Sequence, residues 1–328
     1  MAPGLLSDNQ AEGVNQSAKP TVYVLDKFHP SVIEYCKENF NAIFPDAPEH
    51  ANWRQKARYL LIRGARLAAE DVASCPNLLA IGKQGVGIDK IDAAACAARG
   101  IKIFNTPGVN ARAVAEVVLT LTMAVAREVG RITFNQVQGN LVPKETCSGL
   151  ILSGKTIGII GMGNIGKMVA LMFRGTFDAG VVAYDPFLPE DAWSDVPHSR
   201  VSTFQDVLKV SDVVTIHVPL TEGTRNMISY PQFQMMKRNA ILINAARGGI
   251  VNEADLETAL RERLIFGAGL DCHEQEPPSK ERYGQLWELG VVSTPHVGAA
   301  TGQTQMETGM AAARYLLEYI QSEETTQS

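Results

Sequence analysis

The chain has 328 residues, of which 45% are hydrophobic and 20% charged, and its formal net charge is −5. This length predicts about two globular domains, each large enough for its own core. The sequence has no long basic run, which argues against nucleic acid or an anionic membrane surface as a partner. It also has no run of roughly 18 apolar residues, the length that a membrane-spanning helix needs.

The ends of the chain and its cysteines predict the compartment. Residues 1–20 are polar, without the apolar segment of a signal peptide or an Arg-rich pattern, and predict a disordered tail. The cysteines form no C-x-x-C pair, as expected for small buried side chains in a reducing compartment. They are Cys36, Cys75, Cys96, Cys147 and Cys272. We therefore expect a cytoplasmic protein.

Short apolar segments alternate with helical patterns through the first part of the chain. Five segments predict β-strands, at residues 21–26, 41–44, 59–64, 78–82 and 101–104. Such alternation is typical of βαβ units and parallel sheets. Residues 111–130 then predict one long helix that ends with Gly130 as its C-cap.

A second group of strands follows. Its six segments are residues 155–160, 181–184, 212–217, 240–244, 265–270 and 291–294, the complement of a full dinucleotide-binding sheet. The last helix, at about 304–320, has no following strand to which the chain returns. We therefore expect this helix to pack on the first domain, which makes that domain discontinuous.

The strand at residues 155–160 leads directly into a G-x-G-x-x-G motif made by Gly161, Gly163 and Gly166. In this strand–turn–helix context the glycines permit a tight turn, close approach of a pyrophosphate to the backbone, and close packing of helix on strand. The helix N-terminus then offers free N–H groups to the phosphates. Asp185 follows 19 residues after Gly166, where an acid accepts hydrogen bonds from the adenosine ribose.

Asp185 also predicts which dinucleotide binds. A 2′-phosphate beside a carboxylate would cost roughly 1–4 kcal/mol at contact distance, and residues 186–189 contain no Arg or Lys to reverse this. We therefore expect NAD. The alternative is a glycine-rich turn with an incidental Asp, which the register of the two features disfavours. The fold class that follows is α/β with two doubly wound parallel-sheet domains. The pattern predicts that a Rossmann NAD-binding domain is inserted into a discontinuous first domain.

Polar residues follow the ends of several predicted strands. His217 ends the third strand of the second group, Arg247 follows the fourth, Asp271 and Glu276 follow the fifth, and His296 follows the sixth. In a parallel sheet these strand ends share one edge, where ligands bind. We therefore expect residues from distant segments to meet beside the nicotinamide.

The residue types suit reduction of a ketone by a nicotinamide. His296 would be the proton donor, and Glu276 would be the carboxylate that keeps its ring protonated. Arg247 would bind a substrate carboxylate through two N–H groups of its planar guanidinium. The alternative is three unrelated loop residues. We interpret His217 as a strand-end residue whose backbone, rather than its ring, faces the nicotinamide. We expect no metal, because adjacent side chains in residues 271–274 point apart and no second ligand cluster follows.

These motifs closely resemble the D-isomer-specific 2-hydroxyacid dehydrogenase family, and the match runs from about residue 21 to residue 320. Its most specific segments are GVGIDKIDAAACAARGIKIFNTPG, the fingerprint ending in YDP, HVPLTEGTRNMI, INAARGGIVNE, LDCHEQEPP and TPHVGAAT. The resemblance implies that His296 is the acid/base, Glu276 its partner and Arg247 the substrate-orienting residue. The expected reaction interconverts a small 2-oxo acid and the D-2-hydroxy acid. The resemblance implies the domain bounds: residues 111–298 for the NAD-binding domain, and residues 21–110 and 299–328 for a flavodoxin-like substrate domain.

The resemblance also implies the remaining site residues. Val86 and Gly87 would form a backbone cradle for the substrate carboxylate, and Arg63 a substrate-side cation. Asp271 would bind the nicotinamide carboxamide. The cofactor would contact Gly161, Gly163, Asn164, Ile165, Gly166, Asp185, His217, Val218, Pro219, Ala245, Ala246, Arg247, Asp271, His296 and Gly298. A homodimer through the long helix, around residues 113–127, is a further expectation.

Some features depart from the family or stay open. Cys272 and His273 stand where the family usually has an aliphatic and an aromatic residue. Arg63, Lys83 and Arg112 either contact a second anionic group of the substrate or are surface charges. An NAD(H)-sensing corepressor-like scaffold without physiological turnover is an alternative function, disfavoured by the short C-terminal segment. A second alternative function is that of an oxidoreductase acting on a non-carbon oxyanion such as phosphite.

Overall fold

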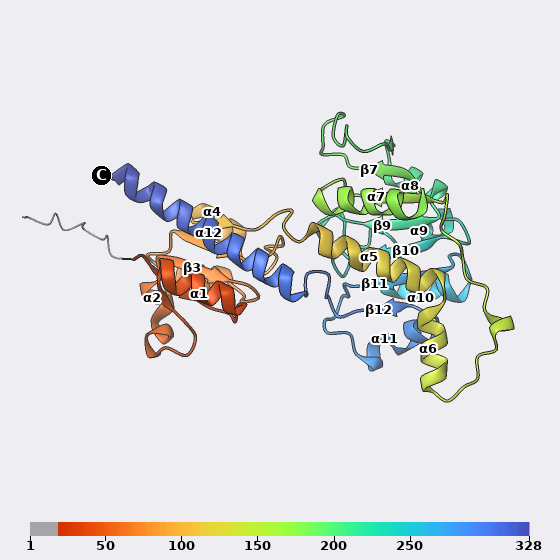
Figure 1. Ribbon diagram of the computed structural model, residues 1–328, viewed down its shortest axis with the longest axis horizontal. Helices are drawn as coiled ribbons and strands as arrows, with labels where there is room; N and C mark the ends of the chain where they lie inside the picture. Colours follow the sequence, from red (N-terminus) through yellow and green to blue (C-terminus); the bar gives the residue numbers. More distant parts are fainter. Residues whose placement is uncertain (1–18, 328) are drawn as a thin grey trace, which may run out of the picture.

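The computed structural model describes residues 19–327; residues 1–18 of the predicted tail lie outside this part. Two groups of elements, each built around its own parallel sheet, lie side by side along the long axis of the molecule (Figure 1). Within the described residues, no helix combines the length and the apolar character that crossing a bilayer requires. Of the five free cysteines, four are buried as expected, whereas Cys147 is only half-buried.

The first sheet has the strand order β2-β1-β3-β4-β5 with all neighbours parallel, which is the flavodoxin-like order. Its strands are β1 (Thr21–Val24), β2 (Asn41–Ile43), β3 (Tyr59–Ile62), β4 (Ala80–Lys83) and β5 (Lys102–Phe104). All five predicted strands are therefore present. Alternate residues of β1 enter different cores, because Val22 and Val24 belong to one hydrophobic cluster and Tyr23 to the other.

Helices cover both faces of this sheet. They are α1 (Pro30–Asn39), α2 (Trp53–Lys56), α3 (Ala69–Ala73), α4 (Ala93–Ala98) and the last helix, α12 (Gly302–Gln327). As Figure 1 shows, α12 returns from the second group to the first. There it packs against α1 and β4. The approach is close at Gly82, where a Cβ atom would lie 2.9 Å from the carbonyl oxygen of Ala312.

The second sheet has the order β12-β11-β10-β9-β6-β7-β8, again entirely parallel. Its strands are β6 (Thr156–Ile160), β7 (Gly180–Tyr184), β8 (Ser199–Arg200), β9 (Val213–Ile216), β10 (Ile241–Asn244), β11 (Gly267–Leu270) and β12 (Val292–Ser293). The chain starts in the centre at β6, runs outward to β8 and restarts on the other side at β9. This reversal is the topological switch point at which doubly wound sheets bind dinucleotides. The two-residue strand β8 was not predicted, because it has no hydrophobic pattern.

Two layers of helices enclose the second sheet. They are α5 (Ala111–Ala126), α6 (Val129–Val137), α7 (Asn164–Phe177), α8 (Phe204–Val210), α9 (Tyr230–Met235), α10 (Glu253–Arg261) and α11 (Lys280–Glu288). The chain also has two short 3-10 helices, Pro48–Asn52 before α2 and Lys144–Thr146 before β6. The apolar faces of α5 and α7 fill one core, and those of α8, α9 and α10 fill the other. The central strands β9, β10 and β11 are therefore buried along their whole length, as is typical of parallel sheets.

The prediction of one helix over residues 111–130 with Gly130 at its C-cap is wrong. Helix α5 ends at Ala126, and Glu128 then takes the left-handed backbone conformation, with φ 55°, before α6 begins at Val129. The carboxylate of Glu128 accepts hydrogen bonds from Arg131 Nε and Ser148 N, at 2.9 and 2.8 Å. Gly130 lies in the first turn of α6, where its role is close packing: a Cβ would lie 2.9 Å from Val292 Cγ2.

Candidate active site

The predicted site residues gather around a cleft of about 860 Å³ between the carboxyl ends of the two sheets. The first sheet contributes Arg63, Lys83, Val86 and Gly87 to its lining. The second contributes Ile165, His217, Val218, Pro219, Ala245, Ala246, Arg247, Asp271, Glu276, His296 and Gly298. The remaining predicted cofactor residues, Gly161, Gly163, Asn164, Gly166 and Asp185, are not among the residues that line this cleft.

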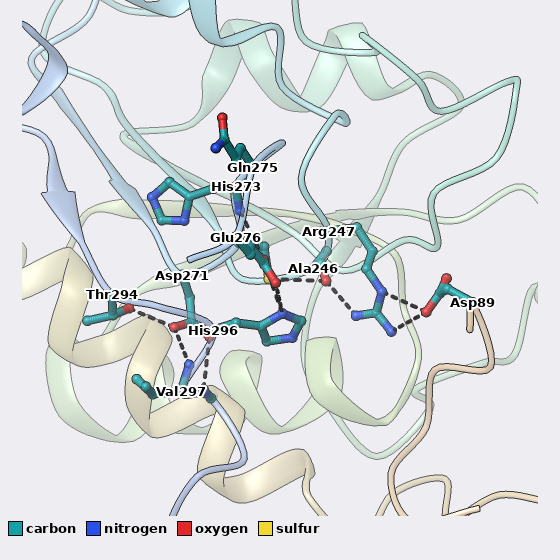
Figure 2. Close-up of polar contacts among 12 residues, drawn as sticks. Asp89, Ala246, Arg247, Asp271, His273, Gln275, Glu276, Thr294, His296 and Val297 are labelled. Atoms are coloured by element: carbon teal, nitrogen blue, oxygen red, sulfur yellow. Dashed lines mark hydrogen bonds and ion pairs between the residues drawn. The ribbon is translucent and has the colours of Figure 1, made fainter. Parts of the chain in front are cut away.

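The imidazole of His296 faces the carboxylate of Glu276. Its Nδ1 lies 3.1 Å from Oε1 and 3.0 Å from Oε2 (Figure 2). Both side chains are partly exposed on the cleft. A carboxylate can only accept, so Nδ1 carries the proton in this contact, and the other ring nitrogen is left for a ligand.

The loop that holds His296 is anchored on Asp271. The backbone N–H of His296 donates to the carbonyl oxygen of Asp271 at 2.7 Å. The Asp271 carboxylate accepts from Thr294 Oγ1, Val297 N and Gly298 N at 2.7, 2.7 and 2.9 Å (Figure 2). These bonds hold His296 in a left-handed conformation, φ 57°, which is uncommon for a residue other than glycine. Asp271 thus positions the His296 loop; its contact with the nicotinamide stays a prediction.

The loop that carries Glu276 is held by a buried network. Glu276 Oε1 accepts from His273 N at 3.2 Å, and Glu253 Oε1 accepts from Glu274 N at 2.8 Å. Tyr283 Oη accepts from Gln275 N at 3.0 Å. Burial raises the pKa of Glu253, so the carboxyl is costly to keep charged there unless these donors satisfy it.

The two residues that depart from the family pattern lie beneath this loop. The His273 ring packs edge-on against Tyr283 with centroids 4.8 Å apart, and its Nε2 lies 2.5 Å from Ser293 Oγ. Burial lowers the pKa of His273. The thiol of Cys272 is buried, 3.4 Å from the carbonyl oxygen of Ala246. His273 therefore fills the core as an aromatic side chain does.

The guanidinium of Arg247 reaches across the cleft to Asp89, which follows β4 of the first sheet. Its Nε and Nη2 each lie 3.0 Å from Asp89 Oδ2, and its Nη1 donates to Ala246 O at 2.6 Å (Figure 2). Partial burial tends to raise the pKa of Asp89, but the adjacent Arg247 outweighs it, and the pKa lies below its usual value. Asp89 was not predicted as a site residue, although it belongs to the GVGIDKID motif.

Gly87 lets this guanidinium approach the backbone. A Cβ at Gly87 would lie 1.8 Å from Arg247 Nη2 and 2.6 Å from Asp89 Oδ2. The carbonyl oxygen of Val86 accepts from Asn105 Nδ2 at 2.7 Å, which fixes the loop. Within the described part of the chain, the N–H groups of Val86 and Gly87 have no hydrogen-bond acceptor. They remain available to a carboxylate held beside Arg247.

The glycine-rich turn fits a dinucleotide. Gly161 has φ 101°, and a Cβ there would lie 2.5 Å from the carbonyl oxygen of His217. A Cβ at Gly166 would lie 2.3 Å from Gly161 O, whereas a Cβ at Gly163 would meet nothing within 4 Å. Gly163 therefore borders open space at the N-terminus of α7, which is where a pyrophosphate needs close approach to the backbone. Asn164 begins this helix.

Asp185 lies beside this turn at the end of β7. Its Oδ2 accepts from Met162 N and its Oδ1 from Phe187 N, both at 2.9 Å. The carboxylate thus braces the glycine turn, and each oxygen keeps further acceptor capacity for a ribose hydroxyl.

His217 is suited to a structural role. Burial lowers the pKa of its ring to about 3, so the ring stays neutral at physiological pH. Its Nε2 lies 3.0 Å from Thr215 Oγ1. That the backbone of His217, rather than its ring, faces the cofactor stays a prediction.

The three basic residues left open by the sequence occupy different environments. Lys83 is buried in the cleft wall, and burial lowers its pKa to about 8. Arg63 is exposed at the cleft. Arg112 lies outside the cleft lining and pairs with Glu116 on the surface of α5, with Nε and Oε1 3.2 Å apart.

Sequence reasoning missed the residues that support the site from behind. Asn244 shapes the turn before Arg247, because its Oδ1 accepts from Ala246 N at 3.1 Å and its Nδ2 donates to Arg247 O at 2.8 Å. Its place at the end of β10 was a usable signal. Glu253 and Tyr283 carry no such signal, because they meet the 271–278 loop only through tertiary packing.

Comparison with known proteins places this geometry in a family. The profile of the "D-isomer specific 2-hydroxyacid dehydrogenase, NAD binding domain" family matches residues 119–298. A hydroxypyruvate reductase from Thermotoga maritima is 39% identical over 253 residues, which cover 76% of this chain and 81% of that protein. A D-3-phosphoglycerate dehydrogenase from Methanocaldococcus jannaschii is 34% identical over 81% of this chain, which spans only 50% of that relative's length. The crystal structure of D-lactate dehydrogenase with NAD⁺ from Lactobacillus jensenii superimposes with a TM-score of 0.72 at 27% identity, covering 90% of this chain and 96% of that one.

Proposed function

Because the chain belongs to the D-isomer specific 2-hydroxyacid dehydrogenases, a family of NAD-dependent oxidoreductases, we propose that it interconverts a small 2-oxo acid and the D-2-hydroxy acid. The observation that carries this proposal is the contact of His296 Nδ1 with both carboxylate oxygens of Glu276, at 3.0–3.1 Å, on the cleft that Arg247 also lines. The cofactor is NAD, whose nicotinamide supplies or accepts the hydride when bound.

His296 acts as the general acid in reduction and as the general base in oxidation. Glu276 accepts a hydrogen bond from the Nδ1–H group of His296. This bond stabilises the imidazolium and orients the ring. Nε2 then donates its proton to the substrate oxygen as negative charge develops there. In the reverse direction the same nitrogen removes the hydroxyl proton.

Arg247 and the 85–87 loop bind the other end of the substrate. The substrate carboxylate displaces Asp89 from the guanidinium and accepts from the N–H groups of Val86 and Gly87. Asp89 keeps the guanidinium paired, and oriented into the cleft, until this exchange takes place. The fork of Arg247 suits carboxylate geometry better than the point charge of a lysine would.

We further propose that residues 21–110 and 299–328 move as one substrate domain relative to residues 111–298. The chain crosses between the two sheets before α5 and again before α12, and these crossings are the expected hinges (Figure 1). Closure would bring Val86 and Gly87 toward His296 and exclude water from the reaction.

The test of the reaction is NADH oxidation by the purified protein across 2-oxo acids of graded size and charge, with chiral analysis of the product. We expect turnover with NADH and a D-2-hydroxy acid as product. Binding of NADH without turnover on any 2-oxo acid, or an L product, would refute the proposal.

The charge of the cleft narrows the substrate class. Lys83 is buried, and among the described residues 19–327 its ammonium has only the carbonyl oxygen of Gln84 as a hydrogen-bond partner. Arg63 lies on the same cleft. An ammonium group buried in this way gains from a second anion in the ligand, because low local dielectric strengthens the attraction. The names of the relatives include both a hydroxypyruvate reductase and a D-3-phosphoglycerate dehydrogenase. We infer that 2-oxo acids with a second anionic group are preferred.

Replacing Lys83 by Met should lower kcat/KM for a 2-oxo acid with a second anionic group about 10-fold or more, because one charge-assisted contact is lost. For pyruvate the change should stay within about 3-fold. Lys90→Met is the matched control, since Lys90 also lines the cleft but is exposed to solvent, and it should change both substrates little. Equal losses for the two substrates in Lys83→Met would contradict the inference.

The protonation state of Lys83 also predicts that substrate preference depends on pH. Burial lowers the pKa of Lys83 to about 8, so its ammonium loses its proton as pH rises through that value. The ratio of kcat/KM for doubly anionic over singly anionic substrates should therefore fall between roughly pH 7 and pH 9. In Lys83→Met the ratio should be flat over this range, which kinetics at fixed ionic strength will show.

We also propose a homodimer. Apolar side chains that follow α5 are exposed in the single chain: Val137 is 78%, Leu141 94% and Ile151 78% exposed. Exposed apolar side chains of this kind often mark a protein interface. Sedimentation velocity should give the mass of a dimer, and the double substitution Val137→Glu, Ile151→Glu should shift it to a monomer. A monomeric wild-type protein at micromolar concentration would exclude the dimer.

A further inference from the structure

We propose that Cys272, Glu276 and His296 form an inhibitory binding site for a divalent cation of the zinc type in the wall of the cleft. The Cys272 sulfur, one Glu276 carboxylate oxygen and one His296 ring nitrogen all lie within 4.8 Å of one another. Thiolate, carboxylate and imidazole are the three ligand types that Zn²⁺ prefers. The ion itself would bind independently of the proposed reaction; its inhibitory effect rests on the proposed function.

The spacing of these atoms is close to that of a tetrahedral site. With bonds of about 2.0–2.3 Å, tetrahedral ligand atoms stand roughly 3.3–3.8 Å apart. The closest pair, His296 Nδ1 and Glu276 Oε2, is 3.0 Å apart. The sulfur of Cys272, within 4.8 Å of both groups, needs to approach them by up to about 1.3 Å to reach the sulfur–nitrogen spacing of a tetrahedral site, about 3.5 Å. Its present partner is the carbonyl oxygen of Ala246 at 3.4 Å, and an S–H donor bond of this kind is weak.

The loops that carry Glu276 and His296 are held in place by their surroundings. Both loops are fixed from behind, by the bonds to Asp271 and by the contact of His273 N with Glu276. Glu276 and His296 line the cleft and give a cation access from solvent, whereas the Cys272 thiol is buried. The nearby Asp271 carboxylate already accepts three hydrogen bonds, which leaves the three named side chains as the donor set.

Binding of the cation requires a defined movement of protons. The Cys272 thiol releases its proton to solvent, and the neutral His296 ring binds through Nδ1 with its proton on Nε2. The metal then takes the position of the proton on Nδ1, which without metal forms the hydrogen bond to Glu276. His296 can no longer be held as an imidazolium, and proton donation to the substrate stops.

Cobalt(II) tests the site without reference to turnover. Added to the full-length protein, Co²⁺ should give the absorption of a thiolate–cobalt bond, and Zn²⁺ should displace it. Cys272→Val should abolish this band, since valine keeps the apolar environment without the sulfur. Cys147→Ala, which removes the half-buried cysteine elsewhere, should retain it. A wild-type protein without the band, or a band that survives Cys272→Val, would overturn the proposal.

Inhibition provides the second arm of the test. Zn²⁺ should inhibit NADH-dependent reduction by the wild type, and Cys272→Val should weaken this inhibition at least ~10-fold, because one of three ligands is lost. Equal inhibition of the two proteins would contradict an inhibitory role. A cobalt band in a protein that reduces no 2-oxo acid would refute the proposed function and leave the metal site standing. Turnover by a protein that gives no cobalt band would refute the metal site and leave the proposed function standing.

Discussion

Replacing His296 by Asn should lower kcat by about 10²–10⁴-fold, the usual contribution of a positioned general acid–base. The ring lies 3.0–3.1 Å from both oxygens of Glu276 and is fixed by its backbone bond to Asp271 O. Asparagine has a similar reach but neither takes up nor gives up a proton near neutral pH. Steady-state kinetics with NADH and the best 2-oxo acid will measure the loss.

Two controls separate loss of the proton donor from loss of structure. NADH binding, followed by fluorescence, should stay within about 3-fold of wild type, since the glycine turn at residues 161–166 is untouched. His198→Asn changes a histidine beside β8, whose Nδ1 contacts Val196 O at 2.7 Å, and should leave kcat unaltered. Undiminished turnover in His296→Asn would remove His296 from the mechanism.

Replacing Arg247 by Lys should lower kcat/KM about 10²-fold. The guanidinium presents a fork, visible in its contacts with Asp89 and Ala246, which a single ammonium cannot reproduce. Losing one charge-assisted hydrogen bond to a carboxylate costs about 1.5–3 kcal/mol, or roughly 10- to 150-fold. Kinetics with a short 2-oxo acid will give the loss, which should appear mainly in KM if Arg247 binds ground state and transition state equally.

Chemical rescue tests the same residue more sharply. Arg247→Ala leaves a gap beside Gly87, where the guanidinium lies against the backbone. Added guanidinium ion should restore part of the activity of this variant, whereas equimolar sodium should not. Activity that is unchanged in Arg247→Lys, or equally low with and without guanidinium in Arg247→Ala, would assign Arg247 a structural role through Asp89.

The sequence predicted the central strands of both sheets well, because strands such as β3, β9 and β10 are buried and therefore marked by apolar, β-branched runs. It also predicted that His217, Arg247, Asp271 and His296 would meet, since every parallel strand delivers its carboxyl end to one edge. The glycine fingerprint was equally readable, because Gly161 and Gly166 are imposed by contacts that allow no side chain.

Features set by long-range packing could not be predicted in this way. The break between α5 and α6 depends on the bond from Ser148 N to Glu128, twenty residues away. The pairing of Asp89 with Arg247 joins residues 158 positions apart, and Glu253 supports the 271–278 loop across the α10–β11 connection. The proximity of Cys272 to Glu276 and His296 likewise arises only when two loops fold together. None of these contacts leaves a periodic pattern in the sequence.

A single-turnover experiment with NADH dideuterated at C4 tests the central claim most directly. The account predicts that one deuterium appears at C2 of a D-2-hydroxy acid, at a rate that falls by about 10² or more in His296→Asn. Deuterium at C2 of the L isomer, or a transfer rate that is the same in wild type and variant, would contradict it.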